Sequence, residues 1–303
     1  MIEILRAGLC DLVMDAGRPG LGVFGVPAGG AADPVAQMAA NRLAGNDADE
    51  AGLEITLAGP ILRFPFGGLV ALTGTHFAAA RGGGAEVAWN ETLVMAAGET
   101  LILDQAKDGC RCWLAVHGGL AVPKVMCSRS TFLPAGFGGH LGRALKAGDA
   151  LPCGSGAGEA RRLRAHPPSR ERASPLRVIT GPQAGLFDDI GLAALFTGTY
   201  RVDASSDRRG FRLAGPAVTH ARVGLPSQGV LPGAIQIPPD GRPIILGWDG
   251  PVTGGYPVIA SVISADLPKL AQLRPGDAVR FMTIELAAAR EQAAAQWIIE
   301  DLG

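Results

Sequence analysis

The chain has 303 residues, a formal net charge of −1 and a hydrophobic content of 48%, which allow two domains and a substantial core. The balanced charge excludes a nucleic-acid-binding footprint and favours a small-molecule or protein partner. Forty-four glycines and twenty-two prolines indicate many tight turns, so we expect a mainly β fold with a few short helices.

The amino terminus lacks the basic stretch and apolar run of a signal peptide, and no apolar run approaches the ~18 residues that cross a bilayer. We therefore expect a soluble, cytoplasmic protein that has no membrane contact. The five cysteines are an odd number without CxxC spacing, which argues against a disulfide framework or a zinc knuckle. No metal site is expected.

The first unusual segment is a glycine- and proline-rich loop within residues 9–30, which carries Arg18. Its Gly20-x-Gly22-x-x-Gly25 matches the dinucleotide fingerprint in letters only, because that motif must open a helix directly. Here the helix signal comes later: Asp33 is a good N-cap, Pro34 suits the first helical position, and Gly45 stops the apolar spacing.

Short strands and turns follow as far as residue 153, and the pattern predicts an N-terminal β subdomain over residues 1–153. Residues 154–174 are poor in apolar residues and rich in arginine, which is typical of a flexible linker. A second β subdomain is expected over residues 175–303, with a short helix at 187–195 and an amphipathic terminal helix at 284–302 that packs through Trp297 and Ile298.

The stretch from Gly233 to Pro257 concentrates polar groups between residues that shape the backbone. Its Pro239-Asp240-Gly241 is a turn signal, and the run from Ile244 to Leu246 is typical of a buried strand. We therefore expect two short strands around a tight turn, followed by a glycine-rich loop, 253–256, whose backbone N–H groups can approach a ligand.

Several catalytic signatures are missing from the sequence, among them the phosphate loop, the serine-hydrolase elbow and the H-E-x-x-H zinc motif. The chain offers glycine-rich rims with arginine, aspartate and one exposed-looking tyrosine. Such rims suit a cyclic amide or ureido ligand, which needs a donor for its C=O and an acceptor for its N–H.

The chain resembles the carboxyltransferase, subdomain A and B family, almost from end to end. That family includes the allophanate hydrolase subunit 2 domain of urea carboxylase, the kinase-inhibitor antagonist proteins and the C subunit of bacterial 5-oxoprolinase. The motifs that carry the resemblance include Asp15-Ala-Gly-Arg18-Pro-Gly20, Gly29-Gly-Ala-Ala-Asp33, Ala40-Asn41, Ser128-Arg-Ser-Thr131, Ser206-Asp-Arg208, Gly233-Ala-Ile-Gln236, Pro239-Asp-Gly241, Thr253-Gly-Gly-Tyr-Pro257 and Ala265-Asp266.

The resemblance implies a pair of cyclophilin-like β-barrel subdomains and a hydrolase subunit in an ATP-dependent 5-oxoprolinase-like complex that opens 5-oxoproline to glutamate. The implied partners are a B-like subunit (allophanate hydrolase subunit 1 or kinase-inhibitor-like) and an A-like subunit. No cofactor is expected to be bound covalently, and ATP is a substrate of the whole complex. One alternative is a carboxyltransferase half of a urea carboxylase system that receives biotin on a separate protein, and another is a non-catalytic regulator that binds a kinase inhibitor.

Residues of the family's motifs give the candidate site. Arg18 and the loop that ends at Tyr256 would polarise the ring carbonyl, and Asp240, Asp249 or Asp266 would act as acid or base. The candidate substrate-binding residues are Asp33, Asn41, Arg208, Arg212, Gln236, Thr253, Gly254 and Gly255. We expect the glycine-lined edges of both halves to meet in one cleft that holds Arg18 and Tyr256.

Overall fold

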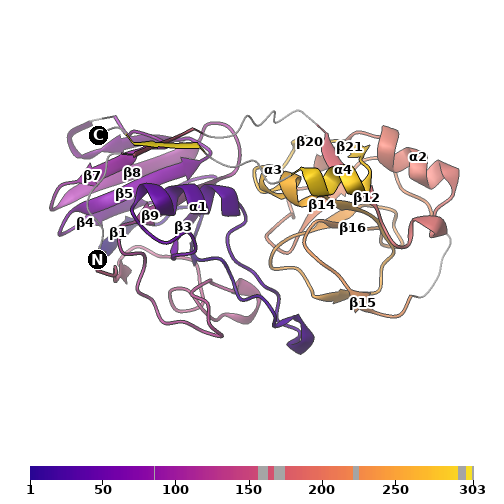
Figure 1. The fold of residues 1–303 in the computed structure, drawn as a ribbon, viewed down its shortest axis with the longest axis horizontal. Coiled ribbons are helices and arrows are strands. Elements are labelled where there is room, and N and C mark those ends of the chain that lie inside the picture. The colour runs from indigo at the N-terminus through magenta and orange to yellow at the C-terminus, as the bar shows by residue number, and fades with distance from the viewer. Residues whose placement is uncertain (85, 156–162, 167–174, 221–224, 293–297, 302–303) are drawn as a thin grey trace. The chain divides into compact units, whose positions relative to one another are not determined.

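The computed structural model describes residues 1–84, 86–155, 163–166, 175–220, 225–292 and 298–301. Two compact units emerge from its internal contacts. The first comprises Met1–Arg18, Gly29–Ser169 and Gln296–Gly303, and the second comprises Pro19–Ala28 and Arg170–Ala295. The elements are mostly short strands, so the prediction of a mainly β fold with a few short helices is confirmed (Figure 1).

Two antiparallel five-stranded sheets make up most of the described part of the first unit. One has the order β10 (Ala150–Leu151), β1 (Ile2–Arg6), β4 (Ile61–Phe64), β8 (Glu99–Ala106) and β6 (Phe77–Arg81). The other has the order β2 (Cys10–Met14), β3 (Gly52–Thr56), β9 (Arg111–Val116), β5 (Gly68–Gly74) and β7 (Thr92–Met95).

Successive residues of a strand point to opposite faces of its sheet, so each sheet can present one set of apolar side chains to the other. Together these side chains form one apolar core. Ile2 and Ile4 of β1 join Leu53 and Ile55 of β3 in a single buried cluster. Strands β5 and β9 of the second sheet also pack against a helix on their other face. β9 accordingly has no exposed residue, and the five residues that follow Arg111 in it are apolar.

Helix α1 (Pro34–Leu43) covers the outer face of the second sheet, where it packs on β5 and β9 (Figure 1). It begins as predicted: the Asp33 carboxylate accepts a hydrogen bond from the amide of Ala36 at 3.0 Å, and Pro34 occupies the first turn. Gly45 follows the helix with a φ of +74°, a conformation that favours glycine. Val35, Ala39 and Leu43 are buried together with Trp113 of β9.

The second unit is built on an eight-stranded sheet within its described residues. The order is β20 (Ala278–Val279), β13 (Tyr200–Val202), β14 (Gly210–Ala214), β17 (Ile244–Leu246), β16 (Ala234–Gln236), β19 (Val258–Val262), β12 (Leu176–Thr180) and β21 (Phe281–Thr283). Only Arg280 separates the two end strands, β20 and β21, along the chain. The sheet must therefore curl until its ends almost meet, which gives a nearly closed barrel.

The predicted strands around the tight turn are present as β16 and β17, which pair antiparallel through Ile235 and Ile245. Gly241 in the turn between them has a φ of +75°. The smaller elements of this unit are α2 (Asp189–Thr197), α3 (Leu267–Leu270), α4 (Leu286–Glu291) and the pair β15 (Gln228–Gly229) and β18 (Thr253–Gly254). The 3-10 turns are η1 (Gly22–Phe24), η4 (Ala184–Leu186) and η5 (Ser264–Asp266) here, and η2 (Gly82–Gly84) and η3 (Leu133–Ala135) in the first unit.

Two predictions near the linker and the carboxyl terminus are wrong. The expected helix over residues 284–302 is only α4, and Ile298–Asp301 forms strand β22 instead. That strand pairs with β11 (Leu163–His166), which lies inside the segment predicted as a flexible linker. Ala165 of β11 is buried and its amide donates to the carbonyl oxygen of Asn90, so contacts distant in sequence override local helix propensity. Trp297 and most of the predicted linker lie outside the described residues.

No helix in the part of the chain that the structure describes has the length and apolar character needed to span a bilayer.

A buried carboxylate in strand β2 makes the stability of the protein dependent on pH. Burial raises the pKa of Asp11 from 3.8 to about 6, although the amide of Gly8, which donates to this carboxylate at 2.6 Å, opposes the rise. Between these two values the native state binds more protons than the unfolded state, so the free energy of unfolding falls as pH rises. The loss, complete above about pH 6, amounts to about 2–3 kcal/mol.

Replacing Asp11 with asparagine should remove this dependence, because an amide keeps the acceptor for Gly8 and does not titrate. Chemical denaturation between pH 4 and pH 7 measures the slope. The matched change at the exposed Asp104 should leave the slope as it is in the wild type. An unchanged slope in Asp11→Asn would contradict the assignment.

Candidate functional site

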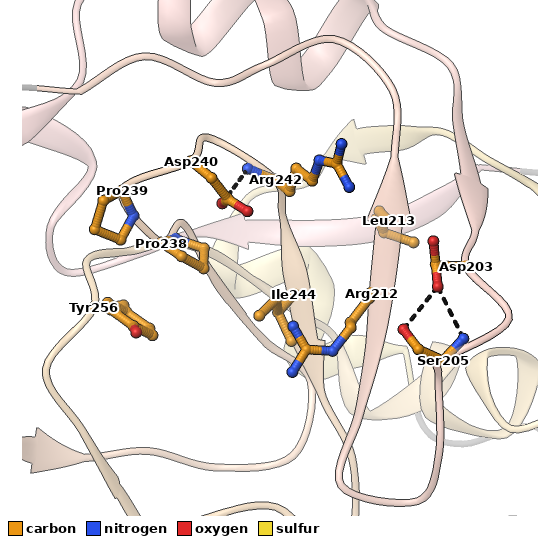
Figure 2. Close-up of a pocket in the computed structure, with 10 residues that line it drawn as sticks. All are labelled: Asp203, Ser205, Arg212, Leu213, Pro238, Pro239, Asp240, Arg242, Ile244 and Tyr256. Carbon is orange, nitrogen blue, oxygen red and sulfur yellow. Dashed lines mark hydrogen bonds between the residues drawn. The ribbon is translucent and has the colours of Figure 1, made fainter.

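A cavity of about 810 Å³ opens on the surface of the second unit, a size typical of small-molecule sites (Figure 2). Its lining combines charged side chains with apolar ones. The residues are Asp203, Ser205, Arg212, Leu213, Pro238, Pro239, Asp240, Arg242, Ile244 and Tyr256. Three of the predicted site residues, Arg212, Asp240 and Tyr256, therefore line one cavity.

The barrel strands determine where these side chains lie. Arg212 of β14 is the cross-strand partner of Ile244 in β17, and Ile244 is in turn the partner of Gln236 in β16. Partners in neighbouring strands point to the same face of a sheet, so these three side chains form a row. Asp240 and Arg242 come from the turn between β16 and β17, and Tyr256 follows β18 and is 44% exposed.

The two carboxylates of the cavity are engaged locally. Asp203 accepts hydrogen bonds from the hydroxyl and the amide of Ser205, at 2.7 and 2.8 Å. These bonds, together with the charges of Arg242 and Arg212, lower the pKa of Asp203. The Oδ1 atom of Asp240 accepts from the amide of Arg242 at 3.1 Å and so stabilises the turn (Figure 2).

Gln236 lies at the buried end of the row and is only 4% exposed. A side chain at Gly254 would meet its Nε2 atom at 2.5 Å, so glycine at this position makes room for the amide group. Within the described residues Nε2 has no hydrogen-bond partner. A buried amide donor without a partner costs roughly 1–3 kcal/mol, which is why such groups are often found where a ligand or water binds. Of the neighbouring candidates, Thr253 is exposed and pairs with Gly229, and Gly255 comes directly after β18.

Asp249, predicted as an acid or base, forms a buried ion pair with Arg208. The guanidinium donates from Nε to Oδ2 at 2.8 Å and from Nη2 to Oδ1 at 3.1 Å. Arg208 and Asp249 are 7% and 4% exposed. Because both carboxylate oxygens already accept hydrogen bonds, this pair has the character of a structural support rather than of a group that exchanges protons with a ligand.

Asp266 is held in a similar way by Arg177, which donates to it from its amide and from its guanidinium at 2.7 Å. Burial alone would raise the pKa of Asp266. The hydrogen bonds from Arg177 and the nearby charge of Lys269 outweigh burial and lower the pKa. Neither Asp249 nor Asp266 lines the cavity.

Arg18, in the first unit, is 2% exposed and its guanidinium carbon lies 5.0 Å from the centroid of the Phe137 ring. Its Nη2 atom donates to the carbonyl oxygen of Ser130 at 2.5 Å. The structure thus places Arg18 inside a polar network and not on an open surface of that unit. The expectation that Arg18 and Tyr256 share one cleft stays a prediction.

Asp15 is the centre of this network. Its carboxylate accepts from the hydroxyls of Ser128 and Ser130 at 2.6 and 2.5 Å, and from the amides of Gly17 and Arg129 at 2.8 and 2.5 Å. A small polar hollow of about 80 Å³ lies beside it, and Lys124 is among its lining residues. The Ser128-Arg-Ser-Thr131 motif therefore serves to position the loop that carries Asp15.

The other two candidates of the first unit also have structural contacts. Asp33 caps α1, as described above. Asn41 is fully buried, and its Nδ2 atom donates to the carbonyl oxygens of Ala48 and Glu50 at 3.1 and 2.8 Å, which holds the loop after the helix.

Sequence reasoning missed Asp203, Ser205 and Arg242 as parts of the site. Arg242 stood in the predicted polar stretch, directly after the turn signal, so its position was a usable clue. Asp203 and Ser205 come from a different strand connection, and only the pairing of β13 with β14 brings them to the cavity.

Comparisons with known proteins agree on one family. A family model described as carboxyltransferase domain, subdomain A and B, matches residues 24–283. The chain is 38% identical to the C subunit of 5-oxoprolinase from Escherichia coli, over 95% of this chain and 93% of that protein. It is 32% identical to the urea amidolyase of Saccharomyces cerevisiae over 95% of this chain, but over only 17% of that protein.

A crystal structure of the Kluyveromyces lactis urea amidolyase superposes with a TM-score of 0.86 at 32% identity, and covers 95% of this chain and 19% of the other. The chain thus spans about a fifth of the urea amidolyases that it matches, and nearly all of the 5-oxoprolinase relative.

Asp249 is held in a buried ion pair and Asp240 is not, so substitution should affect stability differently at the two positions. Asp249→Ala leaves the buried Arg208 without its ion-pair partner and should lower the free energy of unfolding by ~3–5 kcal/mol. Asp240→Ala, at an exposed turn position, should lower it by less than about 1 kcal/mol. Thermal and chemical denaturation of both variants measure the difference, and equal losses would show that Asp249 has no special supporting role.

Proposed function

Because the chain belongs to the carboxyltransferase domain, subdomain A and B family, we propose that it is a subunit of an ATP-dependent 5-oxoprolinase-like complex. The observation that carries this proposal is the match to the C subunit of 5-oxoprolinase, which extends over 93% of that protein. A match of this extent favours the same division of labour between separate chains.

The proposed reaction breaks the ring C–N bond of 5-oxoproline and adds water to the ring carbonyl carbon, which gives glutamate. The energy comes from hydrolysis of ATP to ADP and phosphate. ATP would be handled by the complex, through A-like and B-like partner chains, and need not contact this chain. The chain's own part would be to bind and orient the ring.

The cavity of the second unit is the proposed ring site. The Tyr256 hydroxyl would donate a hydrogen bond to the ring carbonyl oxygen as negative charge develops there. The Asp240 carboxylate, one of whose oxygens accepts no hydrogen bond from the described residues, would accept the ring N–H. Gln236, which is not among the lining residues, would support the strand that carries Ile244. Arg208, Asp249 and Asp266 would support the site from outside it.

A second function is favoured by the similarity to the urea amidolyases at a TM-score of 0.86. In that case the chain would be a carboxyltransferase half that receives a carboxyl group from biotin on a separate protein. Transfer of labelled carboxylate from a biotinylated carrier to urea would support this function over ring opening.

The proposal is tested by co-expressing the chain with its A-like and B-like partners and measuring ATP-dependent loss of 5-oxoproline and formation of glutamate. We expect turnover only when all chains and ATP are present. A stable complex that binds ATP but forms no glutamate would overturn the proposal.

Tyr256→Phe should lower kcat in this assay by at least about tenfold, because it removes one hydrogen bond to the developing oxyanion. The matched control is Tyr200→Phe, which changes the other tyrosine of the chain. The Tyr200 hydroxyl donates to the carbonyl oxygen of Ala194 at 2.9 Å and lies away from the cavity, so this variant should lose some stability but keep its kcat. Equal kcat values for both variants would exclude the proposed role of Tyr256.

A further inference from the structure

Two arginine side chains in the cavity differ from the ion-paired arginines of this unit. Arg212 and Arg242 both line the cavity, and neither guanidinium has a hydrogen-bond or ion-pair partner among the residues that the structure describes. Other arginines of the same unit do have carboxylate partners: Arg177 pairs with Asp266, Arg208 with Asp249, and Arg209 with Asp207.

The carboxylates nearby leave both guanidiniums available. Asp203 accepts from Ser205, and Asp240 accepts from the backbone of Arg242, as described above. The long-range attraction of these acids reduces the positive potential of the cavity, but the guanidinium N–H groups donate to none of the described residues and can donate to a ligand. Guanidinium groups match the planar geometry of a carboxylate and form charge-assisted hydrogen bonds with it.

An apolar surface lies beside the Arg212 side chain. Figure 2 shows Arg212 extending from β14 towards Ile244, on the side of the cavity where Pro238 and Tyr256 lie. Ile244 is the cross-strand partner of Arg212, so its side chain and the guanidinium stem share one face of the sheet. A small flat ring can pack on such a surface while a charged substituent reaches the arginines.

We infer that this cavity takes a small lactam that bears a carboxylate, and that Arg212 and Arg242 bind the carboxylate. This inference rests on the proposed function for the ring itself and adds the group that selects the ligand. The lactam edge would then contact Tyr256 and Asp240, and the carboxylate would contact the guanidinium groups. A neutral ligand such as urea lacks the group that the arginines recognise.

Ligand binding to the full-length chain, measured by calorimetry, tests the inference directly. We expect L-5-oxoproline to bind at least about tenfold more tightly than 2-pyrrolidinone, which is the same ring without the carboxylate. We also expect it to exceed urea and inorganic phosphate by a similar factor, since the first lacks charge and the second lacks the ring. Equal binding of 2-pyrrolidinone or of phosphate, or no binding of L-5-oxoproline, would overturn the inference.

Arginine variants identify the groups responsible. Arg212→Gln and Arg242→Gln should each weaken L-5-oxoproline binding by about fivefold to tenfold and leave 2-pyrrolidinone binding unchanged. Arg280→Gln is the matched control, because Arg280 is also exposed in this unit and lies outside the cavity lining. All three positions are exposed, so thermal unfolding should match the wild type. Loss of L-5-oxoproline binding in the control alone, or in none of the variants, would exclude the assignment.

The same variants in the co-expressed complex separate this inference from the proposed function. A raised KM for 5-oxoproline at an unchanged kcat supports both. Turnover by the wild type with an unchanged KM in the arginine variants overturns the inference and leaves the function standing. Arginine-dependent binding of L-5-oxoproline without any turnover by the complex retains the inference and overturns the function.

Discussion

The buried ion pair between Arg208 and Asp249 is the constraint on which the cavity of the second unit depends. It ties the loop that leads into β14 to the loop that follows β17, and two backbone bonds join the same loops: the amide of Asp249 donates to Arg208 at 3.0 Å and that of Gly247 to Arg209 at 2.9 Å. Gly247 has no side chain, and a Cβ there would collide with the carbonyl oxygen of Arg208. The close approach fixes the register of two strands, and with it the facing positions of Arg212 and Ile244.

Burying the ion pair of Arg208 and Asp249 costs free energy of hydration, which explains why its hydrogen bonds are so fully satisfied. Two charges removed from water lose several kcal/mol of hydration each, and they regain it only if their hydrogen bonds are nearly all satisfied. Asp249 receives two guanidinium bonds, and Asp15 in the first unit receives four bonds from hydroxyls and amides. Satisfied networks of this kind make a loop rigid and specify one conformation. In both units, such networks anchor the loops that carry the family's motifs.

The fold was largely predictable because its signals are local. The cap at Asp33, the turn at Asp240 and the apolar run beginning at Ile244 each determine structure within a few residues, and each is found where it was expected. The terminal strand Ile298–Asp301 was not predictable in this way. Its alanine-rich approach favours a helix, and its actual partner, Leu163–His166, lies more than a hundred residues earlier in a segment that resembles a linker.

For the candidate site too, contacts between residues distant in sequence could not be predicted from local signals. Residue type and motif identified Asp249 and Asp266 as candidate acids, but their arginine partners stand 41 and 89 residues away, and only the folded chain reveals that they are occupied. Arg212, Asp240 and Tyr256 were also chosen by motif, and these lie in the cavity. Asp249 and Asp266 already form ion pairs with arginines, whereas the three residues in the cavity form none among the described residues. A folded chain leaves a buried donor such as the Gln236 amide unpaired only at a free-energy cost. Arg212 stands at the exposed end of the same row, and neither its guanidinium nor that of Arg242 has a partner among the described residues, so the donors that remain for a ligand lie where the cavity opens.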